Sequence, residues 1–94
     1  MKLQKNGLDE FIALMDKAPD KEMQKALYDF FLTAEEISDL SRRLLIIKAL
    51  LAGKKSQREI AKELNVSIAK ITRGSNELKR TNKKLIDFLI KVIG

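Results

Sequence analysis

Apolar residues recur every three or four positions along almost the whole chain, and this spacing constrains the fold more than any other feature. Such spacing places side chains on one face of an α-helix, whereas a strand alternates with a period of two. One proline and four glycines in 94 residues leave few positions that interrupt a helix. We predict an all-α fold of about six helices, with no strand.

The longest helix has a clear start signal, a capping box in which a Ser or Thr and a Glu three residues later bond to each other's backbone N–H. Thr33 and Glu36 form this pattern. It predicts a helix over residues 34–52, which Gly53 is suited to end. Apolar residues cover more than one face of this segment, so we expect other helices to surround it.

Residues 57–79 have the layout of a helix-turn-helix. Ser56 and Glu59 form a second capping box, which starts a helix over about 57–64. Asn65 can adopt the left-handed turn conformation, and Ser67 can cap the second helix. Residues expected to bury the inner sides are Ile60, Ala61, Leu64, Val66 and Ile71, which leaves Ser67, Ile68, Ala69, Lys70, Thr72 and Arg73 on or near the outer face.

Charge is distributed unevenly along the chain. Residues 1–40 carry five Lys/Arg against nine Asp/Glu, and residues 41–84 carry thirteen against three, so the net charges are −4 and +10. The later block predicts a polyanionic partner, although a generally basic protein would share this property. Arg58 can reach a guanine edge or a phosphate. The cations that could neutralise phosphates are Lys54, Lys55, Lys62, Lys79, Arg80, Lys83 and Lys84.

Composition argues against several classes of function. The chain has no cysteine and no histidine, which excludes disulfides, the usual zinc sites and histidine-based catalysis. No convergent pair of carboxylates suggests an enzyme, and no metal site is expected. No apolar run has the length of a signal peptide or a membrane span, so we expect a cytoplasmic protein without a membrane partner.

The chain is predicted to form one domain, residues 1–94, because no linker or low-complexity segment divides it. It is short, yet apolar helices occupy both ends. A single thin core could hardly bury them, and soluble monomers rarely expose large apolar patches. We therefore predict a homodimer.

The segment "ITRGSNELK", residues 71–79, contains three consecutive poor helix formers, Gly74, Ser75 and Asn76. Composition alone predicts that a helix ends at Gly74. However, residues 32–79 closely resemble the bacterial tryptophan operon repressors, with "SQRE", "ITRGSN" and the "LT" capping box at family-like spacings. The resemblance implies an intertwined, all-helical homodimer that binds double-stranded operator DNA when L-tryptophan is present as corepressor.

The resemblance also implies ligand-binding residues. Arg43 and Arg73 would sandwich the indole, because a guanidinium plane stacks on an aromatic face. Thr33 would hydrogen-bond the carboxylate, and Gly74 would leave room for the indole edge. Backbone carbonyls around Phe30 and Leu32 would receive the ammonium group.

Glu77 departs from the family, which has a small serine at this position near the ligand's ammonium group. A carboxylate here has two possible consequences that the sequence leaves open. It could attract the ammonium group, or it could crowd the pocket and repel the ligand's carboxylate.

On DNA, the resemblance makes Arg58 the direct base reader. The residues lining the groove would be Ile68, Ala69, Lys70 and Thr72, and those contacting phosphates Gln57, Ser75 and Lys79. Ala61 replaces a lysine that the family uses at the operator, for which Lys62 could substitute, and Lys70 replaces a threonine. These departures concern operator preference rather than architecture.

The main hypothesis is a tryptophan-dependent transcriptional repressor rather than an enzyme. An alternative is a helix-turn-helix regulator of the same fold whose ligand response is lost or altered. A third class, a helical protein-interaction adaptor, predicts that Arg58→Ala leaves DNA affinity unchanged.

Overall fold

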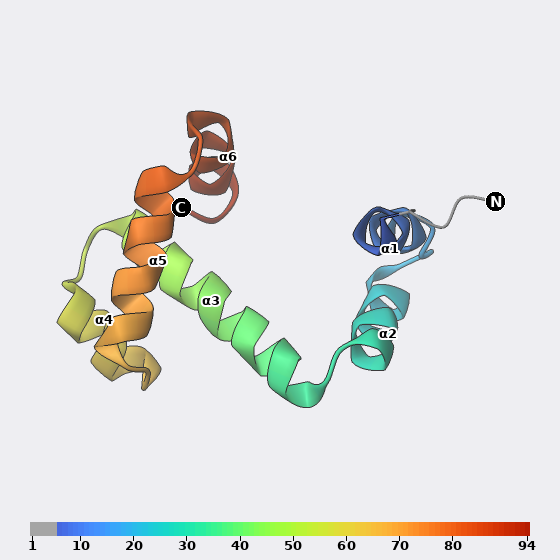
Figure 1. Ribbon diagram of the computed structural model, residues 1–94, viewed down its shortest axis with the longest axis horizontal. Coiled ribbons are helices and arrows are strands. Elements are labelled where there is room, and N and C mark those ends of the chain that lie inside the picture. Colours follow the sequence, from blue (N-terminus) through green and yellow to red (C-terminus); the bar gives the residue numbers. More distant parts are fainter. Residues whose placement is uncertain (1–5) are drawn as a thin grey trace. The chain divides into compact units, whose positions relative to one another are not determined.

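The computed structural model describes residues 6–94, and within them the chain forms six α-helices and no strand (Figure 1). The helices are α1 (Gly7–Asp16), α2 (Lys21–Phe31), α3 (Ala34–Ala52), α4 (Gln57–Leu64), α5 (Ile68–Arg80) and α6 (Lys83–Ile93). The all-α prediction is confirmed. Over this described part of the chain, no helix is both long and apolar enough to cross a membrane.

The start and end signals of α3 act as the sequence predicts. The Thr33 N–H donates to Glu36 Oε1 at 2.9 Å, and the Glu36 N–H donates to Thr33 Oγ1 at 3.0 Å. Gly53 has a φ of +66°, a left-handed conformation that glycine adopts without steric cost. Helix α3 therefore ends at Ala52 because Gly53 turns the backbone away.

The chain divides into two compact units, one ending at Ile37 and one comprising Ser38–Gly94. In the first, the ring of Phe11 on α1 packs against two rings of α2. Its centroid lies 5.8 Å from that of Tyr28 and 5.5 Å from that of Phe31. Met15, at 9% exposure, is buried on the same helix. Contacts between aromatic side chains thus join α1 to α2.

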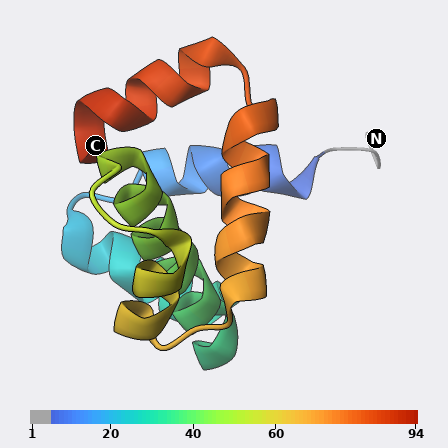
Figure 2. The same ribbon diagram turned by 90° about the vertical axis from the view of Figure 1, so that its left-hand side faces the viewer.

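The second unit has the main core, formed where α4 and α5 pack on each other and on the C-terminal half of α3. Figures 1 and 2 show α4 beside α5, and α6 turning away after the end of α5. The buried members are Ile46, Ile60, Ala61 and Ile71, with Ala49, Leu50, Leu64 and Val66 packed against them. The predicted inner residues of segment 57–79 are therefore confirmed.

Many large apolar side chains are nevertheless exposed in the single chain. They are concentrated on α1, α2, α6 and the middle of α3, and include Leu8, Ile12, Phe30, Phe31, Leu40, Leu44, Leu85, Phe88, Ile90 and Val92. Phe30 is 80% exposed and Val92 60%. Exposed apolar surface on this scale is characteristic of chains that associate.

Helix α5 does not end at Gly74, so the expectation from composition alone is wrong. The helix continues to Arg80, and Gly74 lies against α3. A Cβ atom at this position would meet Ile46 Cγ2 at 3.1 Å and Leu50 Cδ1 at 3.5 Å. The glycine therefore permits a close approach of two helices, and this contact offsets its poor helix propensity.

Candidate functional site: a cleft and an exposed basic helix

A cleft of about 510 Å³ lies between α3 and α5 in the second unit. Its wall on α3 is formed by Asp39, Arg42, Arg43, Ile46 and Ile47, and its wall on α5 by Lys70, Arg73, Gly74 and Glu77. In each set the residues, some of them adjacent pairs, recur every three or four positions, which places them on one face of their helix. The cleft thus combines apolar surface from α3 with four cations and two carboxylates.

Four of the seven residues expected to bind a ligand line this cleft. Arg43 contributes from α3, and Arg73, Gly74 and Glu77 contribute from α5. Phe30, Leu32 and Thr33 lie at the junction of α2 and α3, in the first unit. Since α2 ends at Phe31, the carbonyls of its last turn have no partner within the helix.

Sequence reasoning missed part of the cleft. It assigned no ligand role to Asp39, Ile46 or Ile47, and it gave Lys70 to the DNA groove rather than to the cleft. The spacing of Asp39, Arg43 and Ile46 would have identified the face of α3 that contains Arg43. It would not have shown that this face lies opposite α5.

The residues expected to contact DNA lie on α4 and α5. Arg58, Lys62, Ile68, Ala69, Lys70, Thr72 and Lys79 are exposed, and Gln57 and Ser75 are half-buried. The Thr72 hydroxyl donates to Gln57 Oε1 at 2.9 Å, which links the start of α4 to the outer face of α5. This hydrogen bond fixes two of the candidate DNA contacts relative to each other.

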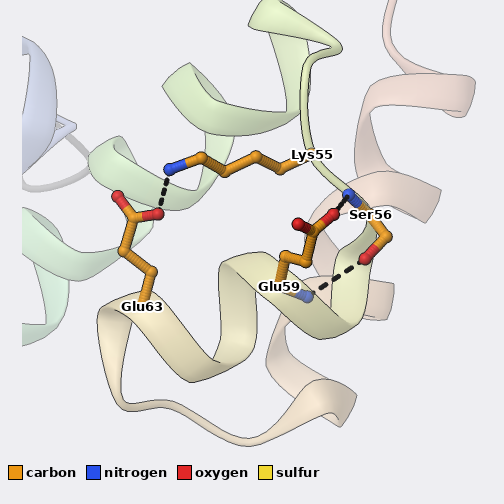
Figure 3. Close-up of polar contacts among 4 residues, drawn as sticks. All are labelled: Lys55, Ser56, Glu59 and Glu63. Carbon is orange, nitrogen blue, oxygen red and sulfur yellow. Dashed lines mark hydrogen bonds and ion pairs between the residues drawn. The ribbon is translucent and has the colours of Figure 1, made fainter.

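Polar contacts hold the start of α4 (Figure 3). The Ser56 N–H donates to Glu59 Oε1 at 2.9 Å, and the Glu59 N–H donates to Ser56 Oγ at 3.1 Å. The bond from the Ser56 N–H, and after it the Ser56 side chain, lower the pKa of the Glu59 carboxyl below its ordinary value of 4.5. Lys55 pairs with Glu63 near the end of the same helix, so its charge is partly engaged within the protein.

The turn between α4 and α5 follows the prediction in detail. Asn65 has a φ of 55° and a ψ of 49°, and its N–H donates to the Lys62 carbonyl. Ser67 then caps α5 by accepting from the Lys70 N–H at 3.4 Å. Two helices joined by this short turn and packed on Ile60 and Ile71 form a rigid support for the exposed side chains.

Within residues 6–94, no group of His, Cys, Asp or Glu side chains is arranged to hold a metal ion.

The protein is thus a small all-α chain in which a basic helix pair lies beside a charged cleft. The sequence profile of the family described as Trp repressor protein matches residues 6–93. A Trp operon repressor homolog of Chlamydia trachomatis serovar L2 is 41% identical over 90 residues, which cover 96% of either chain. A homolog from Chlamydia caviae is 44% identical over 84 residues, which cover 89% of this chain and 83% of the relative. A homolog from Xylella fastidiosa is 39% identical over 87 residues, which cover 93% of this chain and 92% of the relative.

The chain belongs to the Trp repressor family. The profile and these relatives extend over most of its length, which far exceeds the segment 32–79 that carried the resemblance. The family consists of transcriptional repressors, so membership supports a role in repression rather than in catalysis.

Proposed function

We propose that this protein is a tryptophan-dependent transcriptional repressor that acts in the cytoplasm as a homodimer. The observation that carries the proposal is that α5 both lines the cleft and has an exposed surface. One face of this helix lines the cleft through Arg73 and Gly74, and its first turns expose Ile68, Ala69 and Thr72. A ligand in the cleft and a DNA duplex would therefore contact the same helix.

The composition of the cleft supports an aromatic amino acid as its ligand. Its volume of about 510 Å³ lies within the ordinary range of small-molecule sites, about 300–1,000 Å³. Ile46 and Ile47 offer apolar surface to a flat ring. Arg43 and Arg73 offer guanidinium planes that can stack on a ring or bind a carboxylate. Ligand roles for Phe30, Leu32 and Thr33 remain predictions from the family resemblance.

The DNA-reading unit of the proposal comprises α4 and α5. Helix α5 would enter the major groove, a docking geometry for which the Trp repressor is itself a standard example. Arg58 would read a base edge from the start of α4, and Lys62 and Lys79 would contact phosphates along the groove. Gln57 and Ser75 would add hydrogen bonds to phosphates, which position the protein without reading sequence.

A homodimer would supply the second reading unit. The exposed apolar side chains on α1, α2 and α6 support this part of the proposal, because a second copy could cover them. Two copies related by a twofold axis present two α5 helices to half-sites one turn of DNA apart. Tryptophan would regulate the dimer by binding more tightly to the arrangement that fits the operator.

The test measures binding of the homodimer to a tryptophan-operon control region by fluorescence anisotropy, with and without L-tryptophan. We expect tighter binding with tryptophan and a steep loss of affinity as salt increases. Arg58→Ala should cost about 1–3 kcal/mol of specific binding, as expected for one base contact. An operator affinity that does not change across a tryptophan titration would refute the corepressor role.

A second candidate is a regulator of the same fold with a lost or altered ligand response. The observation that favours it is the Glu77 carboxylate in the wall of the cleft. Calorimetry with tryptophan on the wild-type protein and on Glu77→Ser separates the two candidates. Equal, negligible heats with both proteins, together with intact operator binding, would favour the second candidate.

A further inference from the structure

The charged residues that line the cleft have a definite order along α5. Lys70 lies one turn before Gly74, where α5 approaches α3, and Arg73 lies directly before it. Glu77 follows one turn after Gly74. These positions share one helix face, along which the backbone rises about 6 Å from Arg73 to Glu77. A ligand lying across Gly74 would therefore have cations on one side and a carboxylate on the other.

The Glu77 carboxylate has no ion-pair partner within the cleft. Among the described residues its partner is Arg80, whose Nη2 lies 2.5 Å from Glu77 Oε1 and which does not line the cleft. The two side chains are 58% and 73% exposed, so water screens the pair and it is easily exchanged. Asp39, the other carboxylate of the cleft, differs because it pairs at 3.6 Å with Arg42, which lines the same cleft.

The cations on the opposite side are also available. Over residues 6–94, none of Arg43, Lys70 and Arg73 forms an ion pair with a carboxylate. The cleft thus offers free cations to an anionic group and an exchangeable carboxylate to a cationic group. An α-amino acid carries both groups, whereas a ring acid without an amine would place its carboxylate near Glu77 without compensation.

We propose that Glu77 is a specificity-determining residue of this cleft, which favours ligands that carry an ammonium group and discriminates against ring acids that lack one. The inference rests on the proposed function for the existence of an indole ligand, but it concerns a separate property, the choice among indole ligands. A carboxylate at this position could attract the ligand's ammonium group or crowd the pocket, and the inference selects attraction.

The experiment compares three probes by calorimetry on the full-length homodimer. L-Tryptophan carries both charged groups, tryptamine only the ammonium group, and indole-3-propionate only the carboxylate. The measured quantity is the ratio of the dissociation constant of indole-3-propionate to that of L-tryptophan. We expect Glu77→Gln to lower this ratio about fivefold, the effect of one partly exposed ion pair, and to weaken tryptamine by a similar factor.

Two further variants make the test specific. Glu63→Gln removes the same charge from α4, where Glu63 pairs with Lys55 outside the cleft, and should leave the ratio unchanged. Arg80→Gln removes the residue that competes for Glu77 and should raise the ratio about twofold. Circular dichroism establishes that each variant is folded.

The outcomes separate the two claims. If L-tryptophan binds both proteins and Glu77→Gln leaves the ratio unchanged or raises it, the role of Glu77 is refuted and the proposed function stands. If none of the three probes binds the wild-type protein or any variant, the proposed function fails and the inference fails with it. A ratio that falls in Glu77→Gln and not in Glu63→Gln supports the inference.

Discussion

The segment from Ile46 to Ile71 and the helices at the two ends of the chain differ in how they bury apolar residues. Between Ile46 and Ile71, four buried side chains from α3, α4 and α5 meet in one core. Among the described residues of α1, α2 and α6, only Met15 is buried, although α1 and α6 are more apolar in sequence than α4 and α5. Apolar composition therefore does not show which helices a single chain can stabilise.

The two regions therefore differ in the source of their stability. The contacts that position α4 and α5 lie within one chain, so this helix pair has a local source of stability. The outer helices expose residues such as Phe31 and Phe88, so contacts within the single chain bury little of their apolar surface. This arrangement is consistent with the proposed homodimer, in which assembly and folding of the outer helices are coupled.

The largest effect is expected from Phe88→Asp on α6, where the side chain is 59% exposed in the single chain. In a twofold-symmetric dimer the substitution occurs twice. Loss of a buried Phe costs about 3–5 kcal/mol at each site, so we expect at least about 6 kcal/mol per dimer. Sedimentation velocity on a dilution series should then show monomers, and circular dichroism should show reduced helicity.

Lys91→Asp introduces the same side chain at a polar position of the same helix and serves as the control. It should leave assembly largely intact. If Phe88→Asp remains dimeric at the concentrations where the wild-type protein is dimeric, the comparison between core and outer helices does not extend to α6.

The next largest effect is expected from Ile71→Ala, because Ile71 has no exposed surface and lies in the core between α4 and α5. Truncation of a fully buried isoleucine costs about 2–5 kcal/mol of unfolding free energy per chain. Ile68→Ala, three residues earlier on the same helix and 48% exposed, should cost less than about 1 kcal/mol. Urea unfolding measures both, and similar losses in the two variants would contradict the assignment of the core.

Local signals in the sequence predicted the fold well. The capping boxes at Thr33 and Ser56 and the turn at Asn65 involve residues within a few positions of one another, so the sequence contains the whole interaction. The inner face of segment 57–79 could be predicted for the same reason. Spacing alone distinguishes Ile60 and Ile71 from their exposed neighbours.

The cleft could not be predicted in full, because the residues that line its two walls are more than twenty positions apart in the sequence. The family resemblance supplied Arg43, Arg73, Gly74 and Glu77. Asp39 and Ile47 required knowledge of which face of α3 lies opposite α5. The packing role of Gly74 could not be predicted for the same reason, because the side chain that it lies against, Ile46, belongs to the other helix.

Gly74→Ala tests that close approach, and its effect should be smaller. Alanine favours a helix over glycine by about 1 kcal/mol, but its Cβ would lie 3.1 Å from Cγ2 of the buried Ile46. Overpacking costs about 1–3 kcal/mol, so we expect a net loss of about 1 kcal/mol in unfolding free energy. Gly7→Ala in α1, where nothing lies within 4 Å of the added Cβ atom, should be neutral or stabilising. A stabilised Gly74→Ala would show that α3 and α5 can separate at no cost.

The smallest effect is expected from Glu59→Gln, which alters the capping box that starts α4. The pKa of Glu59 is lowered from 4.5 in the folded protein, mainly by the backbone N–H of Ser56 and then by its side chain. The unfolded chain therefore binds a proton more readily than the folded one. The stabilisation by Glu59 is complete above its ordinary pKa and is lost as the pH falls through the lowered value.

Glu59→Gln should therefore flatten the pH dependence of unfolding free energy below about pH 5 and leave the rest of the profile unchanged. Ser56→Ala is the informative partner, because it removes the hydroxyl and keeps the backbone N–H, which is the larger cause of the shift. It should lower stability by about 1 kcal/mol, as the loss of an N-cap does, and retain most of the pH dependence. Urea unfolding at several acidic pH values distinguishes the two variants. If Ser56→Ala flattens the profile as much as Glu59→Gln does, the side chain and not the backbone of Ser56 controls the carboxylate.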